Sequence, residues 1–517
     1  MKVLNHVIPW IGLLVVICIS TEGHYSLMEA YPHRTVFEDE RFYVAQAGRH
    51  AKDDWTTLLP GNLDFGMRPP FFGHVLSRVA PRNAEITAYT LREGVDRKTA
   101  ARQLYLRQAR QLHIVLHAVI CVLLFLQAQF LGLRGVAALL PVVLLSLLPR
   151  YMFHIHGMWS ELLHMVLQLS AMTALIYGIR RRRVWLALPA GLAFGFAVLT
   201  RTTSLFYIPL APLLFLAASF IRNKKGRLQE RLLPGMAMSF LFVVAFCLVV
   251  IPQLYVNIDR ALGPRLAANN WLNIHYALRP RGDDSQQYIY DWQLASQAES
   301  DRAQYYNYAV VRRELKARAE VRDFVERRGL FSLIPRQAEM AWEVLTVGPS
   351  QFEQALTRWI VGPDAVRELR PFVRLDRVLW LGLVVCGLLG MVAMFYRNSG
   401  WIMVMSYVAY YLVALCGAPV DARMAFQLAP FLCLATAGAW TAALMIPFKF
   451  MRAVAMEANR QRRELVAKRA ARRQEDAAVQ AAAPPPAAPP PAAEAAAAEP
   501  AQAPAPDPQA PSAEATS

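Results

Sequence analysis

Long apolar runs are the feature that most constrains this chain. Stretches approaching 20 residues with few charges recur through most of its 517 residues, and 55% of all residues are hydrophobic. A bilayer core about 30 Å thick requires a helix of about 20 apolar residues to cross it. The sequence therefore predicts an all-α polytopic membrane protein rather than a soluble domain.

About ten of these runs fit as transmembrane helices. We expect spans at 6–21, 113–133, 135–149, 158–179, 184–200, 203–221, 235–252, 377–396, 401–418 and 426–446. The first run is interpreted as a retained anchor rather than a cleaved signal, because nine further spans follow it and "CISTEG" is a poor cleavage site.

The spans divide the chain into seven parts. They are a first transmembrane helix (1–21), a first external loop (22–112), a transmembrane bundle (113–252), a second external loop (253–376), C-terminal transmembrane helices (377–446), a basic cytoplasmic helix (447–473) and a tail (474–517). Both large loops are expected to be partly helical, the second through "YNYAVVRRELKARAEVRDFVERRG". The Ala/Pro-rich tail cannot bury a core and is expected to be disordered.

Positive charge predicts the orientation. The formal net charge is +17, and Lys and Arg collect in cytoplasmic turns of membrane proteins. The turns "GLRG", "RRRR", "RNKKGR", "YRNSG" and "KFMR" all become cytoplasmic if the N-terminus is inside. We therefore expect a multi-pass cell-membrane protein with external or periplasmic large loops and a cytoplasmic tail. Membrane lipids are expected partners of the basic helix, and no motif indicates nucleic acid.

The short external turns each carry one arginine, against the orientation preference. These are Arg150 in "LLPRYMF", Arg201 in "LTRTTS" and Arg423 in "VDARMAF". One interpretation is that they extend to lipid headgroups or pair with carboxylates of the loops. The other is that they converge on an anionic ligand at the membrane surface, such as a lipid-linked phosphate.

A carboxylate and several histidines mark the start of the fourth span. Glu161 begins this span in "GMWSELLHM", His164 lies one turn further on, and His154 and His156 precede it. Intramembrane carboxylates are a functional hint, and His and Glu are suitable zinc or manganese ligands. The spacing is irregular, however, and no H-E-x-x-H pattern is present, so structural or hydrogen-bonding histidines are the favoured interpretation.

The first external loop opens with a crowd of carboxylates in "EDERFYVAQAGRHAKDDW". If this stretch is helical, Asp39, Tyr43 and Ala47 lie on one face and Glu40 projects about 100° away. A solvated charge run is the ordinary explanation for such a stretch. The residues that follow, "DDWTTLLPGNLDFGMRPPFF", favour a functional explanation instead.

Taken together, these segments resemble the GT-C-type membrane glycosyltransferases, specifically the protein-mannosyltransferase-like and aminoarabinose-transferase-like family. The first loop of that family typically reads D-E-x-x-Y-x-x-x-A, then a Trp, then K-P-P-L. The counterparts here are Asp39, Glu40, Tyr43, Ala47, Trp55 and Arg68-Pro69-Pro70-Phe71. "LLPRYMFHIHGMWSELLHMVL", "AGLAFGFAVLTRTTSLFYIPLAPLL", "VIPQLYVNIDRALG" and "DARMAFQLAPFLCL" are similar to later family segments in the same order. Arg68 replaces the family Lys, and Met67 stands where metal-binding relatives can have an acid.

The resemblance implies transfer of a sugar from a polyprenyl-phosphate-linked donor to a glycan, lipid or protein acceptor on the outer face, with inversion. It implies that Asp39 is the catalytic base beside Glu40. It further implies that Arg68, Arg201 and Arg423 bind the donor phosphate. Tyr43, Glu161, His154 and His156 are candidates for positioning the acceptor or donor; no metal ligands are assigned.

Two other classes compete with a transferase. A transporter or flippase of a lipid-linked anion would be expected to show repeated halves and broken helices, and no clear repeat is present. A scaffold would use the basic helix and the tail to recruit cytoplasmic partners. No cofactor is required by the sequence, although a divalent cation stays open as an alternative.

Overall fold

The computed structural model describes the greater part of the chain. The described residues are 2–30, 43, 47, 70–157, 159–222, 228–259, 266, 271, 303–329, 331, 335, 338, 339, 342, 345, 346, 363–394, 400–415 and 426–482. All regular secondary structure in these ranges is helical. The predicted all-α fold class is therefore confirmed.

The described residues form the following helical elements, in chain order. They are α1 (Lys2–Ala30), α3 (Phe71–Arg78), α4 (Asn83–Glu93), α5 (Arg97–Phe130), η2 (Gly135–Ala138), α6 (Leu140–Ser146), α7 (Pro149–Ile155), α8 (Glu161–Arg181), η3 (Val184–Leu186), α9 (Ala187–Thr200), η4 (Thr202–Tyr207), α10 (Leu210–Arg222), α11 (Leu228–Asp259), α14 (Ala303–Arg328), α17 (Pro363–Met394), α18 (Gly400–Leu415) and α20 (Ala429–Ala482).

Apolar helices lie at every predicted span. Among the described residues, five helices are long and apolar enough to cross a membrane: Val7–Ala30, Arg97–Phe130, Glu161–Arg181, Leu232–Ile258 and Arg370–Met394. Five shorter apolar helices are Gly135–Ser146, Val184–Thr200, Leu210–Phe220, Gly400–Ala414 and Ala429–Leu444. Each predicted span overlaps one of these ten segments. The chain is a multi-pass membrane protein.

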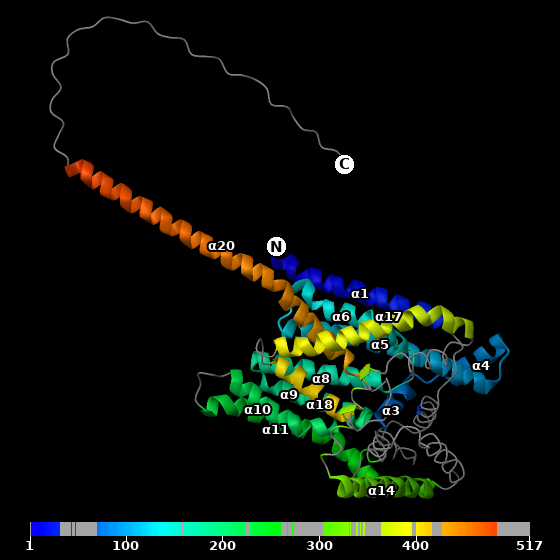
Figure 1. Cartoon of the computed structure of the whole chain (residues 1–517). Helices are drawn as coiled ribbons and strands as arrows, with labels where there is room; N and C mark the ends of the chain where they lie inside the picture. The colour runs from blue at the N-terminus through cyan, green and yellow to red at the C-terminus, as the bar shows by residue number, and fades with distance from the viewer. Residues whose placement is uncertain are drawn as a thin grey trace, which may run out of the picture. The chain divides into compact units, whose positions relative to one another are not determined.

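The helices of residues 1–446 form a bundle in which α8 and α9 lie next to each other. On either side, α5 packs on α8 and α11 packs on α9, with α10 against α11 (Figure 1). Two close approaches allow this packing. A side chain at Gly191 of α9 would overlap the Phe242 carbonyl of α11, and one at Gly390 of α17 would overlap the Ala435 carbonyl of α20. Small residues at helix contacts are typical of membrane bundles, since they let backbones approach.

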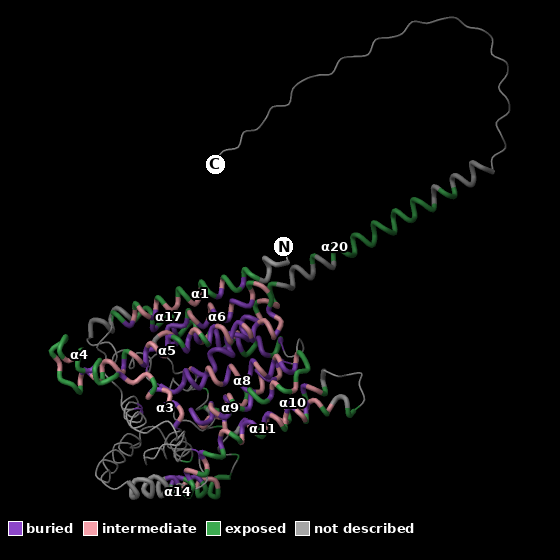
Figure 2. The backbone as a smooth tube through the Cα atoms, turned by 180° about the vertical axis from the view of Figure 1, so that it is seen from behind, coloured by how far each residue is buried: buried purple, intermediate pink, exposed green. Residues whose placement is uncertain are grey.

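Burial follows the same arrangement. Buried residues concentrate in α5, α8 and α9, whereas exposed residues recur along the whole of α1 and α11 (Figure 2). Large apolar side chains occupy much of that exposed surface; on α17, Val378, Val385, Leu389 and Val392 repeat at helical spacing and are more than half exposed. A stripe of this kind is a liability in water but is suited to contact with lipid tails.

Helix ends differ from the predicted boundaries at several places. The spans expected to begin at 113 and 377 are the apolar ends of helices that start at Arg97 and Pro363. Charged residues lengthen these helices, since a helix is ended by its backbone hydrogen bonding rather than by loss of apolar character. Asp96 caps α5 by accepting hydrogen bonds from the backbone amides of Lys98 and Thr99.

Two further predictions concern helices outside the bundle. The helix expected within "YNYAVVRRELKARAEVRDFVERRG" is confirmed as α14. α20 continues from the last apolar segment into the basic stretch and ends at Ala482, so no break in helical structure separates 426–446 from 447–473. The chain divides into two compact units, Met1–Ile446 and Pro447–Ser517. In the second unit, the side chains described from Val454 to Ala471 are exposed.

Candidate functional site

A buried ion pair joins the beginning of α8 to the end of α9. Arg201, the residue after α9, places Nη1 2.6 Å from Glu161 Oε1 at the first residue of α8. Glu161 is only 2% exposed. The helix dipole favours a carboxylate at a helix N-terminus and a cation at a C-terminus, so both charges suit their positions. Each also neutralises the other, as buried charges require.

Tyr43 of the first-loop motif reaches this pair through Ser160. The Tyr43 hydroxyl lies 3.0 Å from Ser160 Oγ, and Arg201 Nη1 lies 3.4 Å from the same oxygen. The Tyr43 ring packs edge-on against Phe72 with centroids 4.8 Å apart. Three of the predicted site residues, Tyr43, Glu161 and Arg201, therefore belong to one hydrogen-bonded group.

Four predicted site residues lie outside the described residues. These are Asp39, Glu40, Arg68 and Arg423. Tyr43, which is described, follows Asp39 by four residues in the sequence. Their roles stay predictions.

A second polar group fixes the helices around the ion pair. His164, one turn along α8 from Glu161, places Nδ1 2.8 Å from the Ala197 carbonyl of α9, and its Nε2 lies 3.2 Å from Ser204 Oγ of η4. Gln168 joins the same group and donates to the Tyr407 hydroxyl of α18. His164 thus ties α8 to α9 and η4, and Gln168 extends the contact to α18.

The two other predicted histidines make different contacts. The His154 ring stacks on Phe426 with centroids 3.9 Å apart and lies 4.3 Å from the Trp159 ring. His156 Nε2 lies 3.3 Å from His24 Nδ1 of α1. The described contacts show an aromatic role for the His154 ring and a hydrogen-bonding role for the His156 ring. Among the residues that the structure describes, no group of three or more His, Cys, Asp or Glu side chains is placed to hold a metal ion.

Arg150 pairs with a carboxylate that the sequence did not single out. Its Nη2 lies 2.9 Å from Asp376 Oδ2 of α17, and its backbone amide donates to Asp376 Oδ1 at 2.9 Å. The guanidinium also lies over the Trp380 ring. Carboxylate pairing, rather than an anionic ligand, is the interpretation that holds for Arg150. No pattern indicated Asp376, because its partner is 226 residues away.

Tyr411 of α18 is the residue near the ion pair that sequence reasoning missed. It is 1% exposed and lies one turn beyond Tyr407, which bonds to Gln168 of α8. It lies in the apolar stretch "SYVAYYLVAL", where a tyrosine reads as an ordinary core residue. Only packing of α18 beside α8 brings it to the site.

Part of the chain that contains the site is similar to a known sequence family. Residues 66–261 match the family model of dolichyl-phosphate-mannose-protein mannosyltransferases. No curated protein sequence matches the chain. The matched segment contains Glu161 and Arg201, together with the helices α5 to α11 that position them.

The solved structures that the chain matches are distant in sequence. The oligosaccharyltransferase of Archaeoglobus fulgidus shares 12% identity, covering 86% of this chain and 51% of its own, with a TM-score of 0.47. ArnT from Cupriavidus metallidurans, solved with undecaprenyl phosphate, shares 16% identity over 84% of this chain and 77% of its own, with a TM-score of 0.30. The chain thus spans about half of the length of the archaeal enzyme.

The family match confirms the predicted resemblance over residues 66–261. The matched segment is therefore similar to membrane mannosyltransferases over residues 66–261.

Proposed function

We propose that the chain transfers a sugar from a polyprenyl-phosphate-linked donor to a protein, lipid or glycan acceptor at the outer face of the membrane. The observation that carries the proposal is the buried Glu161–Arg201 pair bonded through Ser160 to Tyr43. It connects the first-loop motif to the spans within the segment that matches the mannosyltransferase family. A partly buried cation that is linked through Ser160 to Tyr43 of the first loop suits a reaction whose leaving group is a phosphate.

In the proposed reaction, Asp39 accepts the proton of the acceptor hydroxyl, with Glu40 as its neighbour. The acceptor oxygen bonds to the anomeric carbon of the sugar while the bond from that carbon to the phosphate oxygen breaks. Polyprenyl phosphate leaves with the bonding electrons, and Arg68, Arg201 and Arg423 stabilise its charge. Attack in line with the leaving group inverts the anomeric centre.

Glu161 has a positioning role in this proposal. Its ion pair holds the Arg201 guanidinium in one orientation, so the phosphate meets a cation that need not be reorganised during the reaction. Tyr43 fixes the first loop against Ser160. In this proposal His154 and His156 position the residues next to the ion pair. His154 does so by stacking on Phe426, and His156 by its hydrogen bond with His24.

Orientation and metal use complete the proposal. The large loops are placed outside and the tail inside on the basis of the positively charged turns. The reaction as written needs no metal, and a divalent cation remains the alternative. Activity that survives EDTA unchanged would support the metal-free reaction, whereas loss restored by Mn²⁺ or Mg²⁺ would establish the cation.

The test is turnover of a polyprenyl-phosphate hexose by the purified protein in detergent. We expect Asp39→Asn to lower transfer by about 10²–10⁴-fold, since that is the usual contribution of a general base. Glu161→Gln should also lower it. Glu93→Gln is the matched control, because Glu93 pairs with Arg92 at an exposed position and should turn over donor like the wild type.

Two results would contradict the proposal. One is wild-type transfer by Asp39→Asn at normal expression. The other is a requirement for an ion gradient across a sealed membrane, which would instead favour the transporter alternative. Mass spectrometry of surface glycans from a gene deletion would then identify the missing sugar and the acceptor.

A further inference from the structure

Two buried polar atoms beside the Arg201 cation have no hydrogen-bond partner among the described residues. They are Glu161 Oε2, on the same carboxylate whose other oxygen meets Arg201, and the hydroxyl of Tyr411. The two side chains are 2% and 1% exposed. Both groups are therefore shielded from solvent and have no partner in the described part of the chain.

Such atoms are costly to keep. An unsatisfied buried hydrogen-bonding group destabilises a fold by about 1–3 kcal/mol, and native proteins retain few of them. For Tyr411 the cost is easily avoided, because phenylalanine fills nearly the same volume. A tyrosine at this position calls for a partner that the described residues do not supply.

The hydroxyl groups of the neighbouring tyrosines, unlike that of Tyr411, have hydrogen-bond partners. Tyr407 is bonded to Gln168, Tyr410 donates to the Thr203 carbonyl, and Tyr207 lies 3.0 Å from Ser406 Oγ. The rings form one aromatic cluster in which Tyr407 contacts each of the others. Within this cluster, the Tyr411 hydroxyl is the one that the described residues leave unpaired.

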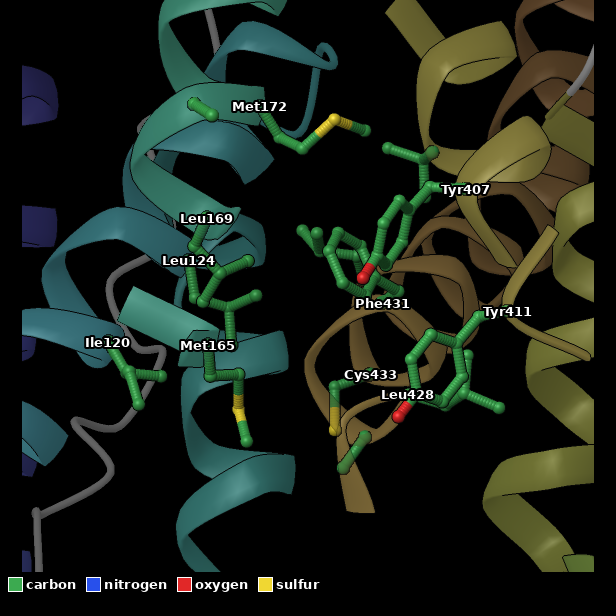
Figure 3. Close-up of a cluster of buried hydrophobic side chains, with 14 of the residues drawn as sticks. Ile120, Leu124, Met165, Leu169, Met172, Tyr407, Tyr411, Leu428, Phe431 and Cys433 are labelled. Atoms are coloured by element: carbon green, nitrogen blue, oxygen red, sulfur yellow. The ribbon is translucent and has the colours of Figure 1, made fainter. Parts of the chain in front are cut away.

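Tyr411 and Glu161 lie at the same end of the bundle. Glu161 is the first residue of α8 and Tyr411 is near the last residue of α18. Figure 3 shows Tyr411 extending from α18 with its hydroxyl toward Cys433 of α20, on the side that faces Met165 of α8. Helix α18 packs against α8, and Tyr407, one turn before Tyr411, bonds to Gln168, two turns beyond Glu161.

We propose that Tyr411 and the second oxygen of Glu161 recognise hydroxyl groups of the sugar ring of the donor, and that Tyr411 is a specificity-determining residue. This inference rests on the proposed function. A carboxylate oxygen accepts a hydrogen bond from a sugar hydroxyl, and a phenol can both donate and accept one. Together the two groups offer an acceptor and a donor–acceptor to the hydroxyl groups of a pyranose.

The charge of the site selects a neutral sugar. Glu161 is already compensated by Arg201 at 2.6 Å, so an amino sugar would bring an ammonium that has no free counter-charge in this pair. A uronic acid would bring a second carboxylate toward Glu161. A neutral hexose satisfies both orphan atoms without adding charge to a buried region.

The decisive variant is Tyr411→Phe. Because the hydroxyl has no described partner, its removal should leave the Tm of the ligand-free protein unchanged or raise it. Donor turnover should fall about 10–100-fold in kcat/KM, because the site then loses a hydrogen bond made to the substrate. Tyr207→Phe is the matched control: it removes a bonded hydroxyl from the same cluster and should lower the Tm while keeping the donor preference of the wild type.

A series of polyprenyl-phosphate hexoses, each lacking one hydroxyl, identifies the contact. The wild type should discriminate against one deoxy donor, and Tyr411→Phe should lose that discrimination while keeping the others. Equal discrimination by both proteins would overturn the inference, as would a Tm loss in Tyr411→Phe as large as that in Tyr207→Phe. Equal discrimination would indicate that a bound water lies between Tyr411 and Glu161. A loss of Tm would indicate that the Tyr411 hydroxyl has a partner within the protein.

The outcomes separate this inference from the proposed function. Turnover of the hexose donor by the wild type with no change in Tyr411→Phe overturns only the role of Tyr411. Failure of the wild type to turn over any polyprenyl-phosphate sugar overturns the proposed function and the inference with it.

Discussion

The Arg150–Asp376 pair gives the sharpest stability prediction. It joins α7, which precedes the candidate site, to α17, and it is enclosed on both sides: Asp376 is fully buried and Arg150 is 6% exposed. Asp376 accepts from the Arg150 backbone amide and from the guanidinium, which also contacts the Trp380 ring. We expect Asp376→Asn to destabilise the protein strongly while preserving its shape.

The magnitude follows from these contacts. The asparagine keeps one oxygen for the backbone amide of Arg150 but turns an NH₂ group toward the guanidinium and removes the counter-charge. Breaking one side of a buried pair costs about 3–5 kcal/mol, because the other charge stays buried and uncompensated. Adding Arg150→Met removes that charge, so the double variant should recover most of the loss.

Unfolding by SDS titration in mixed micelles measures these differences as a double-mutant cycle. Glu326→Gln is the control, since Glu326 pairs with Arg322 at exposed positions of α14 and should leave the transition in place. The reasoning is refuted if Asp376→Asn unfolds like the control, or if the Arg150→Met change adds a further loss instead of restoring stability.

Two further predictions concern helix packing and capping. Gly390→Ala should lower the Tm, since the added Cβ would overlap the Ala435 carbonyl, whereas Gly382→Ala meets open space and should not; equal effects in a thermal-shift assay would contradict the close approach. Asp96→Ala should destabilise the start of α5, seen as faster amide exchange there. Hydrogen bonds from Thr99 hold the pKa of Asp96 below its ordinary value, so its contribution is complete above the ordinary pKa and is lost as the pH falls through the lowered one. If the protection factors of the amides at the start of α5 in the wild type do not change on acidification, this role is excluded.

Much of the fold could be predicted from the sequence, because lipid imposes a simple rule. A span must be apolar over its whole length, so runs such as 235–252 and 377–396 are visible without knowledge of any neighbour. The helix ends were harder to predict. α5 starts at Arg97, far before its apolar part, because the Asp96 cap and backbone hydrogen bonds decide where a helix begins.

The candidate site was predicted where its residues carry charge against the surrounding pattern. Glu161 and Arg201 stood out as ionisable residues at the ends of apolar runs, and the structure brings them together. Asp376 and Tyr411 did not stand out. One looked like an ordinary carboxylate in a charged segment and the other like an ordinary aromatic residue in a span.

By itself the sequence determined that the chain is helical and multi-pass, and it indicated the class of enzyme, because apolar runs and an ordered set of short motifs are local properties. Tertiary structure alone decided which charges meet. The sequence left Arg150 and Arg201 as equivalent outside arginines; packing of α7 against α17 pairs Arg150 with Asp376, whereas packing of α8 against α9 pairs Arg201 with Glu161 beside Tyr43. The physical reason is that the energy of a buried charge depends on what lies within a few ångströms of it, and that distance is set by helix packing rather than by position along the chain.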